Sequence, residues 1–344
     1  MAHQSLYRAY RPHSFADLIG QDHIVKPLTE QLSSEKVGHA YLFAGSRGLG
    51  KTSVARIFAH ELKTSDRDLY EIDAASNNSV DDIRLLSEQV YTLPFNSPYK
   101  VYILDEAHML SKGAWNAFLK TLEEPPAHAI FILATTELEK VPETVRSRCQ
   151  VFEFKKPGRE GLANLVVTIA KKEGCVLDVA AADLIAMLAD GSYRDALSVL
   201  ERVLASSTDQ KLTLEEVEQA TGAPKHALVH ALVFALSSGE AHAALVAVRK
   251  AGEQNVDMSL FLSLTLEMMR SVLLARHAPE IRPELARELG TDVLAEVVAL
   301  ADAQDSKLTH DTLRAFLDAA SRIRFSPIPS LPLELAVMEV SRQD

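Results

Sequence analysis

A glycine-rich segment, GSRGLGKT at residues 45–52, contains the first side chains that could do chemistry. It follows the apolar run Tyr41–Ala44 and precedes a helical pattern of apolar residues. Glycines let backbone N–H groups wrap phosphates, the lysine can reach the β and γ oxygens, and the following hydroxyl can bind Mg²⁺. This strand–loop–helix order predicts a P-loop for a nucleoside triphosphate. Its predicted phosphate-binding residues are Gly45, Ser46, Arg47, Gly48, Leu49, Gly50, Lys51 and Thr52.

Two consecutive carboxylates, Asp105 and Glu106, follow the apolar run Val101–Leu104. Ligands of open α/β sheets bind at the carboxyl ends of the strands. Behind a P-loop, this pair predicts that Asp105 holds Mg²⁺ through its water shell and that Glu106 orients or polarises the attacking water. Lys51, Thr52 and Asp105 would serve binding of MgATP. Glu106 matters mainly once water attacks, so the sequence predicts ATP hydrolysis as well as binding.

Five short apolar runs in the first half of the chain have the length of buried strands. Each is separated from the next by enough residues for a helix, which is the βαβ rhythm of a parallel α/β layer. The predicted strands are Tyr41–Ala44, Leu69–Ile72, Val101–Leu104, Ile130–Ala134 and Val151–Phe154. Beyond Pro157 the strand signal disappears, and amphipathic helices are predicted at Leu162–Lys172, Ala180–Ala189 and Arg194–Ala205.

Three domains are predicted from these patterns. Thr213 and Glu216 fit a capping box that opens a further helix, and Gly222 with Pro224 marks a joint. The sequence therefore predicts an α/β nucleotide-binding domain at 1–157, a small helical lid domain at 158–222 and an all-α domain at 223–344.

Composition excludes several classes of protein. The chain has 344 residues, 47% of them hydrophobic and 24% charged, which are ordinary globular values. Two cysteines cannot form a disulfide framework or supply four zinc ligands, so a reduced, cytoplasmic protein is expected. The first residues contain no apolar leader segment, and the apolar runs at 129–134 and 227–236 are shorter than a membrane span.

The net charge of −11 argues at first against binding to nucleic acid, but the charge is unevenly distributed. Residues 1–157 contain 18 basic and 20 acidic side chains, and residues 158–344 contain 18 and 27. A nearly neutral front half can still present a basic face, so the net charge does not exclude DNA as a partner.

Beyond these motifs, the sequence resembles the gamma/tau subunits of the bacterial DNA polymerase III clamp loader, which are AAA+ ATPases. The resemblance covers nearly the whole chain. The segments that carry it are YRAYRPHSFADLIGQDHI at 7–24, the P-loop, EIDAASNNSVDDIR at 71–84, VYILDEAHMLSKGAWNAFLKTLEEPP at 101–126, ILATTELEKVPETVRSRCQVFEF at 132–154 and GSYRDALSVLE at 191–201.

The resemblance implies roles for further residues. Thr136 resembles the sensor that positions the water and reads the γ-phosphate, with Thr135 the weaker candidate. Arg148 resembles an arginine finger that acts on ATP held by the adjacent subunit, and its planar charged fork suits a transferring phosphoryl group. Arg194 resembles the second sensor. The residues that resemble the segment along the adenine base are Tyr7, Arg11, Pro12 and Ile24.

One departure from the family concerns zinc. Members commonly have a four-cysteine zinc module before the EIDAASNN segment, whereas HELKTSDRDLYEIDA crosses that interval here without cysteine. A short polar linker around Lys63–Asp68 replaces the module, so no zinc is predicted.

The resemblance also implies partners. These are the delta and delta-prime subunits and further gamma copies in a ring of five joined through a helical collar, a sliding clamp, and primer–template DNA read by its shape. Residues 77–84 would follow the DNA backbone, with Arg84 and Lys100 as loosely held contacts. Leu93–Phe95 would face the clamp, although a place in the core is equally compatible with the sequence.

Two other functions are alternatives to a clamp-loader ATPase. A non-hydrolysing scaffold like the delta-prime subunit usually has a degraded P-loop, whereas this P-loop and Asp105–Glu106 are intact. An AAA+ ATPase of recombination or repair does not account for the EIDAASNN and SRC segments. His108 completes the letters DEAH, but the other helicase motifs are missing, so helicase activity does not follow.

Overall fold

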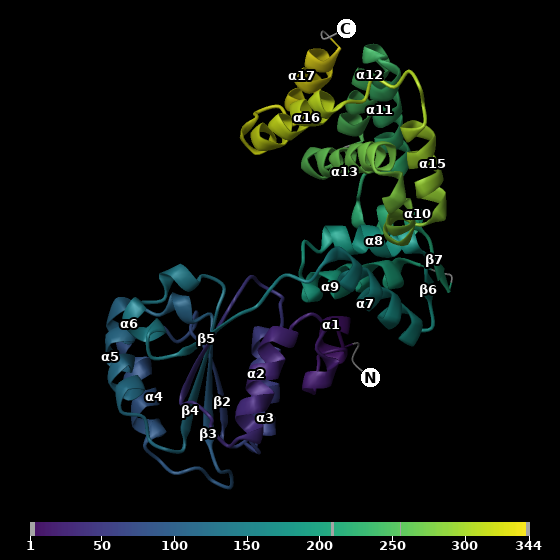
Figure 1. Cartoon of the computed structure of the whole chain (residues 1–344). Coiled ribbons are helices and arrows are strands. Elements are labelled where there is room, and N and C mark those ends of the chain that lie inside the picture. Colours follow the sequence, from purple (N-terminus) through teal and green to yellow (C-terminus); the bar gives the residue numbers. More distant parts are fainter. Residues whose placement is uncertain (1–3, 208–209, 255, 342–344) are drawn as a thin grey trace. The chain divides into compact units, whose positions relative to one another are not determined.

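The computed structural model describes residues 4–207, 210–254 and 256–341, with only the backbone described at Glu288 and Asp292 (Figure 1). Residues 1–3 of the segment predicted to lack a leader lie outside this description. The chain divides into two compact units, residues 1–162 with 189–198, and residues 163–188 with 199–344. The division into three domains stays a prediction.

The first unit is built on a five-stranded parallel sheet, which confirms the predicted α/β class. Its strands are β1 (Ala40–Ala44), β2 (Leu69–Asp73), β3 (Lys100–Asp105), β4 (Ala129–Thr135) and β5 (Gln150–Glu153). The neighbouring pairs are parallel and the order is β2-β3-β4-β1-β5. β3, β4 and β1 are therefore adjacent, and their carboxyl ends meet at one edge of the sheet.

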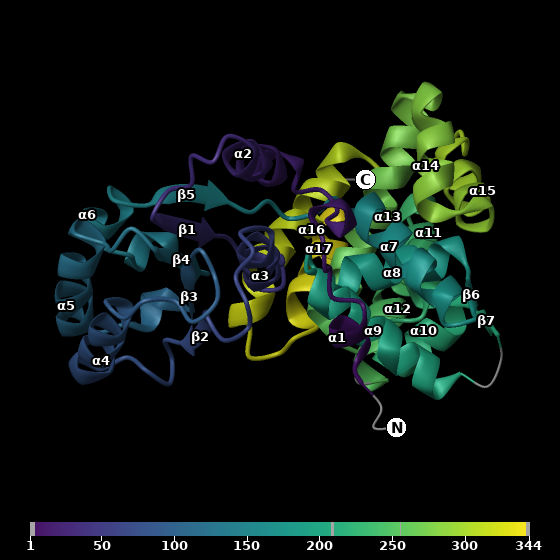
Figure 2. The ribbon, with the colours of Figure 1, turned by 90° about the horizontal axis from the view of Figure 1, so that it is seen from below.

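Helices cover both faces of this sheet (Figure 2). α2 and α3 pack on one face, and α4 and α5 pack on the other. In β3, Val101 and Ile103 join the α2–α3 core, whereas Tyr102 and Leu104 join the α4–α5 core. Because both faces are buried, the strands appear in the sequence as continuous apolar runs. The helix bounds are α2 (Asp22–Ser33), α3 (Lys51–Glu61), α4 (Val80–Val90) and α5 (Lys112–Glu123).

Several short helical segments also belong to the first unit. They are α1 (Leu6–Ala9), η1 (Phe15–Asp17), η2 (Ala107–Met109), η3 (Leu138–Lys140) and α6 (Glu143–Arg146).

The three helices predicted after Pro157 are present as α7 (Arg159–Lys172), α8 (Val179–Leu188) and α9 (Tyr193–Ser206). The predicted Thr213–Glu216 capping box opens α10 (Leu214–Thr221). The expectation that no strand follows Pro157 is wrong, because β6 (Val176–Leu177) and β7 (Lys211–Leu212) pair in parallel. Strands of two residues are too short to leave a periodic pattern in the sequence.

The rest of the second unit is a helical bundle. Its elements are α11 (His226–Ser238), α12 (Ala241–Glu253), α13 (Met258–His277), η4 (Pro279–Ile281), α14 (Arg282–Leu289), α15 (Thr291–Ala301), α16 (His310–Arg322), η5 (Ile323–Phe325) and α17 (Leu331–Val340). α13 has 20 residues with a mean hydropathy of 1.5, long and apolar enough to cross a membrane, and the sequence patterns above did not single it out. Its Phe261 and Met269 lie in the core of the bundle, as expected of the central helix of a globular domain.

The linker between α3 and β2 is organised by Asp68, which is 1% exposed. Its carboxylate accepts the N–H groups of Phe95 at 2.7 Å and Asn96 at 3.1 Å. Burial alone would raise the pKa of Asp68, but the N–H groups and the Ser97 and Ser65 hydroxyls outweigh burial and lower it to about 2. The segment predicted as a plain polar linker therefore holds the loop before β3.

We predict that Asp68→Ala lowers the free energy of unfolding by about 2–3 kcal/mol, because buried N–H groups lose a charged acceptor. Since the folded pKa lies below the unfolded value, the wild type should lose this contribution as the pH falls from about 4 to about 2. Urea unfolding across this pH range measures both effects. Exposed Asp66→Ala is the control, and equal stability of the two variants would contradict the role of Asp68.

Candidate nucleotide-binding site

The GSRGLGKT segment connects the carboxyl end of β1 to the start of α3, as predicted for a P-loop. Gly45, Gly48 and Gly50 have φ of 147°, 79° and 91°. A Cβ at Gly45 would meet the Phe154 carbonyl oxygen at 2.8 Å, and a Cβ at Gly48 would overlap the Ser192 hydroxyl. Glycine at these two positions is therefore required by both the turn and its neighbours.

Lys51 and Thr52 are the first two residues of α3, directly after the glycines of this loop. Lys51 is buried, and its Nζ donates to the carbonyl oxygens of Gly45 at 2.7 Å and Ser46 at 2.9 Å. Burial lowers the pKa of Lys51, and nearby carboxylates oppose this effect. The Thr52 hydroxyl donates to Asp105 Oδ2 at 2.8 Å. The structure thus joins the hydroxyl and carboxylate that the sequence predicts for Mg²⁺, and both are oxygen groups of the kind that this ion prefers.

Glu106 and Thr136 also meet at this edge of the sheet. Glu106 has φ of 48°, in the left-handed region that is uncommon for residues other than glycine. The Thr136 hydroxyl donates to Glu106 Oε2 at 3.1 Å. Thr135 is fully buried and is hydrogen-bonded to His108. Of the two threonines at the end of β4, Thr136 is therefore the one that contacts Glu106.

The start of α9 packs against the P-loop. The Tyr193 N–H donates to the Gly48 carbonyl oxygen at 3.2 Å, and its hydroxyl donates to the Ile19 carbonyl oxygen. The guanidinium carbon of Arg194 lies 4.8 Å from the centre of the Tyr7 ring, within range of a cation–π interaction. Sequence reasoning predicted Arg194 and Tyr7 but missed Tyr193, because its P-loop contact joins distant parts of the chain.

The remaining residues predicted along the adenine base differ in their surroundings. The Arg11 Nε donates to Ser53 Oγ at 2.9 Å, and burial together with the charge of Arg56 lowers the pKa of Arg11. Pro12 is half-buried. Ile24 is fully buried in the α2–α3 core, so its side chain has no exposed surface in this structure.

Arg148 lies at the opposite edge of the sheet from the P-loop. It comes just before β5, whose residue Gln150 pairs with Tyr41 near the start of β1, whereas the P-loop follows the end of β1. At about 3.3 Å per residue, the length of the strand puts roughly 13 Å between them. The Arg148 guanidinium donates to the Thr144 carbonyl oxygen at 2.6 Å and to Glu123 Oε1 at 2.7 Å. Arg148 therefore faces away from the phosphate site of its own chain.

Lys100 does not fit the loosely held expectation of a DNA contact. It is 4% exposed, and its Nζ donates to the Gln89 carbonyl oxygen at 3.0 Å and to Thr92 Oγ1 at 2.6 Å. Burial lowers the pKa of Lys100. These acceptors lie at the end of α4, so Lys100 fastens that helix end to β3. Arg84, by contrast, is exposed on α4 beside Asp81.

The loop before β3 exposes apolar side chains. Leu93 is 79% exposed and Phe95 is 65% exposed, with the Arg67 guanidinium carbon 4.9 Å from the Phe95 ring centre. The alternative prediction, that this segment packs into the core, is therefore wrong for these two side chains.

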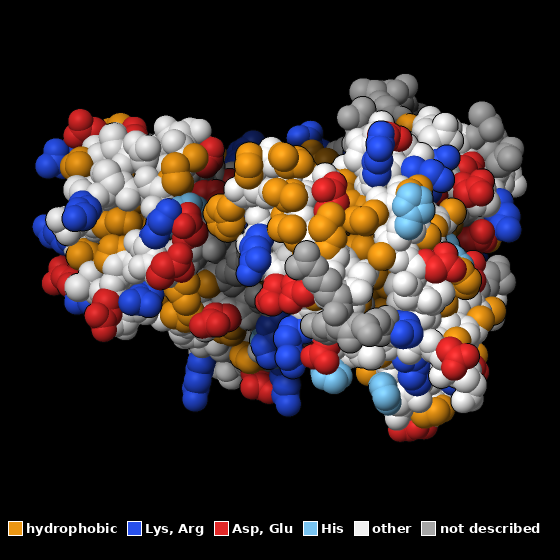
Figure 3. Space-filling model, turned by 90° about the horizontal axis from the view of Figure 1, so that it is seen from above, with side chains coloured by type: hydrophobic (Ala, Val, Ile, Leu, Met, Phe, Trp, Pro, Cys, Tyr) orange, Lys and Arg blue, Asp and Glu red, His pale blue; other side chains and the backbone are white. Residues whose placement is uncertain are grey.

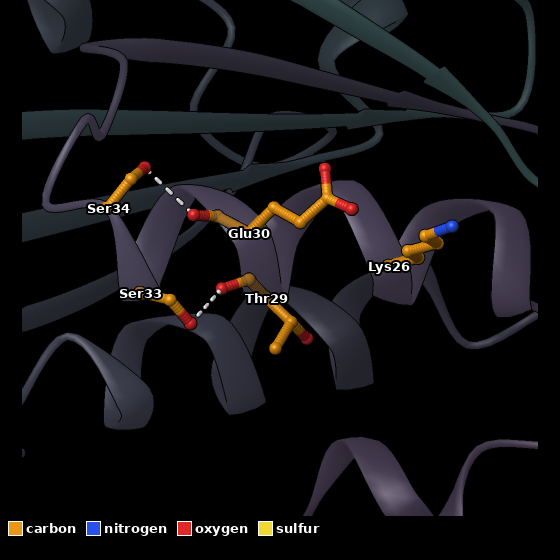
Figure 4. A pocket seen from close by; sticks show the side chains of 5 residues that line it. All are labelled: Lys26, Thr29, Glu30, Ser33 and Ser34. Atoms are coloured by element: carbon orange, nitrogen blue, oxygen red, sulfur yellow. Dashed lines mark hydrogen bonds between the residues drawn. The ribbon is translucent and has the colours of Figure 1, made fainter.

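A shallow hollow over α2 is not a second nucleotide site (Figure 4). It is lined by Lys26, Thr29, Glu30 and Ser33 of this one helix and by Ser34, which follows it. The hydroxyls of Thr29, Ser33 and Ser34 donate to carbonyl oxygens of the helix itself. Within residues 4–207, 210–254 and 256–341, no group of three or more His, Cys, Asp or Glu side chains is arranged to hold a metal ion.

Subunits of DNA polymerase III are similar to this chain along most of its length. A family profile described as "DNA polymerase III, delta subunit" matches residues 20–78 and 62–158. The DNA polymerase III subunit tau of Bacillus subtilis is 36% identical over 361 residues, which cover 99% of this chain and 63% of that protein. The DNA polymerase III subunit gamma of Buchnera aphidicola is 32% identical over 362 residues, which cover 98% of each chain.

Among solved structures, the Thermotoga maritima RuvB Holliday junction branch migration motor aligns with a TM-score of 0.54 and 22% identity. The alignment covers 85% of this chain and 90% of that one, and it supports the P-loop fold alone. Against the Bacillus tau subunit and a Mycobacterium gamma/tau subunit, the chain spans 63% and 52% of their lengths.

We predict that Thr52→Val removes most of the thermal stabilisation that MgATP gives to the wild type. The change keeps the side-chain volume but deletes the hydroxyl beside Asp105, and ligand-induced stabilisation follows affinity. Melting curves with and without MgATP measure the shift. Thr29→Val on the exposed face of α2 is the control, and an unchanged MgATP shift in Thr52→Val would exclude the assigned role.

Proposed function

The chain belongs to the DNA polymerase III gamma/tau family, and on that premise we propose that it is an ATPase motor subunit of a bacterial clamp loader. MgATP binding at subunit interfaces would organise an assembly that opens a sliding clamp. Hydrolysis would then release the clamp on primer–template DNA during replication. The observation that carries the proposal is a pair of hydrogen bonds at one edge of the sheet, from Thr52 to Asp105 and from Thr136 to Glu106.

The chain's own residues divide into binding and hydrolysis. The P-loop amides and Lys51 would hold the triphosphate, and Arg194 with Tyr7 would lie beside the nucleotide. Mg²⁺, held by Thr52 and through water by Asp105, would supply charge neutralisation at the β- and γ-phosphates. Glu106, oriented by Thr136, would polarise the attacking water. An intact set of these residues favours this function over a non-hydrolysing scaffold.

Arg148 would complete the site of a neighbouring subunit. Its place at the far edge of the sheet supports action on another chain, and its guanidinium would have to leave Glu123 to reach a phosphate there. We expect the isolated subunit to be a poor ATPase for this reason. The family resemblance supports a ring of five with delta, delta-prime and further gamma copies.

Residues 223–344 would form the collar of this ring. A groove of about 390 Å³ lies between α16 and α17 and is lined partly by Phe325, Leu331 and Leu335. Phe325 is 88% exposed, and further exposed apolar side chains are Leu317 of α16, Met338 of α17 and Ile328 in the segment that precedes α17. In Figure 3, hydrophobic side chains gather over the carboxyl-terminal helices. An exposed apolar surface of this kind is typical of a contact between subunits.

Other parts of the proposal concern the sliding clamp, the DNA and the place of action. Leu93 and Phe95 would face the clamp, and the start of α4 with Arg84 would follow the DNA backbone through its N–H groups. The protein would act in the cytoplasm, without zinc and with the three domains given by the sequence. RuvB-like recombination activity has no support beyond the shared fold.

We predict that ATPase activity rises when delta and delta-prime subunits, a sliding clamp and primed DNA are added. Glu106→Gln should retain ATP binding but lose at least about 100-fold in turnover, because it removes the group that polarises water. Phosphate release and binding of a fluorescent nucleotide measure the two properties. No stimulation in any combination of partners would contradict the clamp-loader function.

We also predict that Arg148→Ala abolishes most of the stimulated ATPase but leaves nucleotide binding by the isolated subunit within about twofold. The expected loss is about 1,000-fold or more, as for other arginine fingers. Arg249→Ala, which removes an exposed arginine of the bundle, is the control. If Arg148→Ala weakens nucleotide binding by the isolated chain, the assignment to a neighbouring site is wrong.

A further inference from the structure

His108 lies next to the carboxylate of Glu106, the proposed catalytic group, and the sequence patterns predict no role for it. Its side chain is 8% exposed. Its Nδ1 lies 3.5 Å from Glu106 Oε2 and 3.2 Å from Thr135 Oγ1, and its Nε2 lies 3.2 Å from Glu137 Oε1. The imidazole therefore stands between the end of β3 and the end of β4.

The hydrogen bonds around the ring are satisfied by the tautomer that has its hydrogen on Nε2. Thr135 Oγ1 accepts the Glu137 N–H at 3.1 Å, which leaves its hydroxyl hydrogen free to be donated to Nδ1 of His108. The Nε2–H then donates to the Glu137 carboxylate. A hydrogen bond from Lys140 lowers the pKa of Glu137 and keeps it an acceptor.

In this arrangement Nδ1 has no hydrogen to offer Glu106. The ring instead lies beside the Glu106 carboxylate, with Nδ1 3.5 Å from Oε2, and it engages the hydroxyl of Thr135. Glu106 Oε2 is left with the Thr136 hydroxyl as its partner at 3.1 Å. The left-handed backbone at Glu106 fixes where its side chain starts, but the side-chain torsions still need a second constraint.

We propose that His108 is a positioning residue for Glu106: its ring, fixed at the end of β4 by Thr135 and Glu137, packs beside the carboxylate and restricts it to the rotamer that reaches Thr136. This inference rests on the proposed ATPase function, in which Glu106 polarises the attacking water. Without the ring, the carboxylate would rotate toward Thr135 and away from the water.

The test compares His108→Ala and His108→Asn in the stimulated ATPase assay with the full set of partners. His108→Ala should lower kcat about 10-fold or more, with KM and nucleotide affinity within about twofold. His108→Asn should recover part of kcat, because its amide oxygen can still accept the Thr135 hydroxyl. His128→Ala is the matched control, since the His128 ring is also hydrogen-bonded within the first unit, to the Val90 carbonyl oxygen, but precedes β4 at the opposite edge of the sheet.

Unchanged kcat in both His108 variants would overturn the inference while leaving the ATPase function intact. Loss of nucleotide affinity in parallel with kcat, in His108→Asn as well as His108→Ala, would also overturn it, because the histidine would then support the fold and not the carboxylate. A wild-type protein without stimulated ATPase would instead contradict the proposed function, so the two failures are distinguishable.

Discussion

The adjacency of β3, β4 and β1 is the constraint on which the candidate site depends. Parallel pairing puts the carboxyl ends of these strands at one edge, where the P-loop, Asp105–Glu106 and Thr136 follow them. Two hydrogen bonds then join the segments that follow these strands, from Thr52 to Asp105 and from Thr136 to Glu106. A shift of one residue in any of the three would turn the wrong side chains toward the site, because successive residues point to opposite faces.

The sequence predicts what local patterns determine. The five strands are buried on both faces and appear as apolar runs, and the Thr213–Glu216 capping box lies within four residues, so both are readable. The order of the strands is not readable, because placing β1 between β4 and β5 depends on contacts between distant segments. The same limit applies to Asp68, whose partners lie about 28 residues away.

In the candidate site, too, some residues can be predicted from local sequence patterns and others only from contacts between distant segments. Lys51, Thr52 and Asp105 follow from motif spacing, whereas the contact of Tyr193 with Gly48 requires the fold to bring α9 to the P-loop. His108 could be read as part of a DEAH pattern, but the letters say nothing of its surroundings. Its partners Thr135 and Glu137 belong to the end of another strand, so only the folded sheet reveals what the imidazole contacts.

The position of Arg148 separates binding from hydrolysis in the proposed function. Because the length of the β1–β5 pair separates Arg148 from the P-loop of its own chain, the proposed finger would have to act on a neighbouring chain, whereas the proposed nucleotide-binding residues all belong to one chain. The ion pair with Glu123 is partly exposed, and such pairs contribute only about 0.2–1 kcal/mol. A neighbouring subunit could therefore break the Arg148–Glu123 ion pair at a small cost in free energy. Each chain holds its own Glu106 in place, but hydrolysis would begin only when assembly brings the Arg148 of another chain to the site.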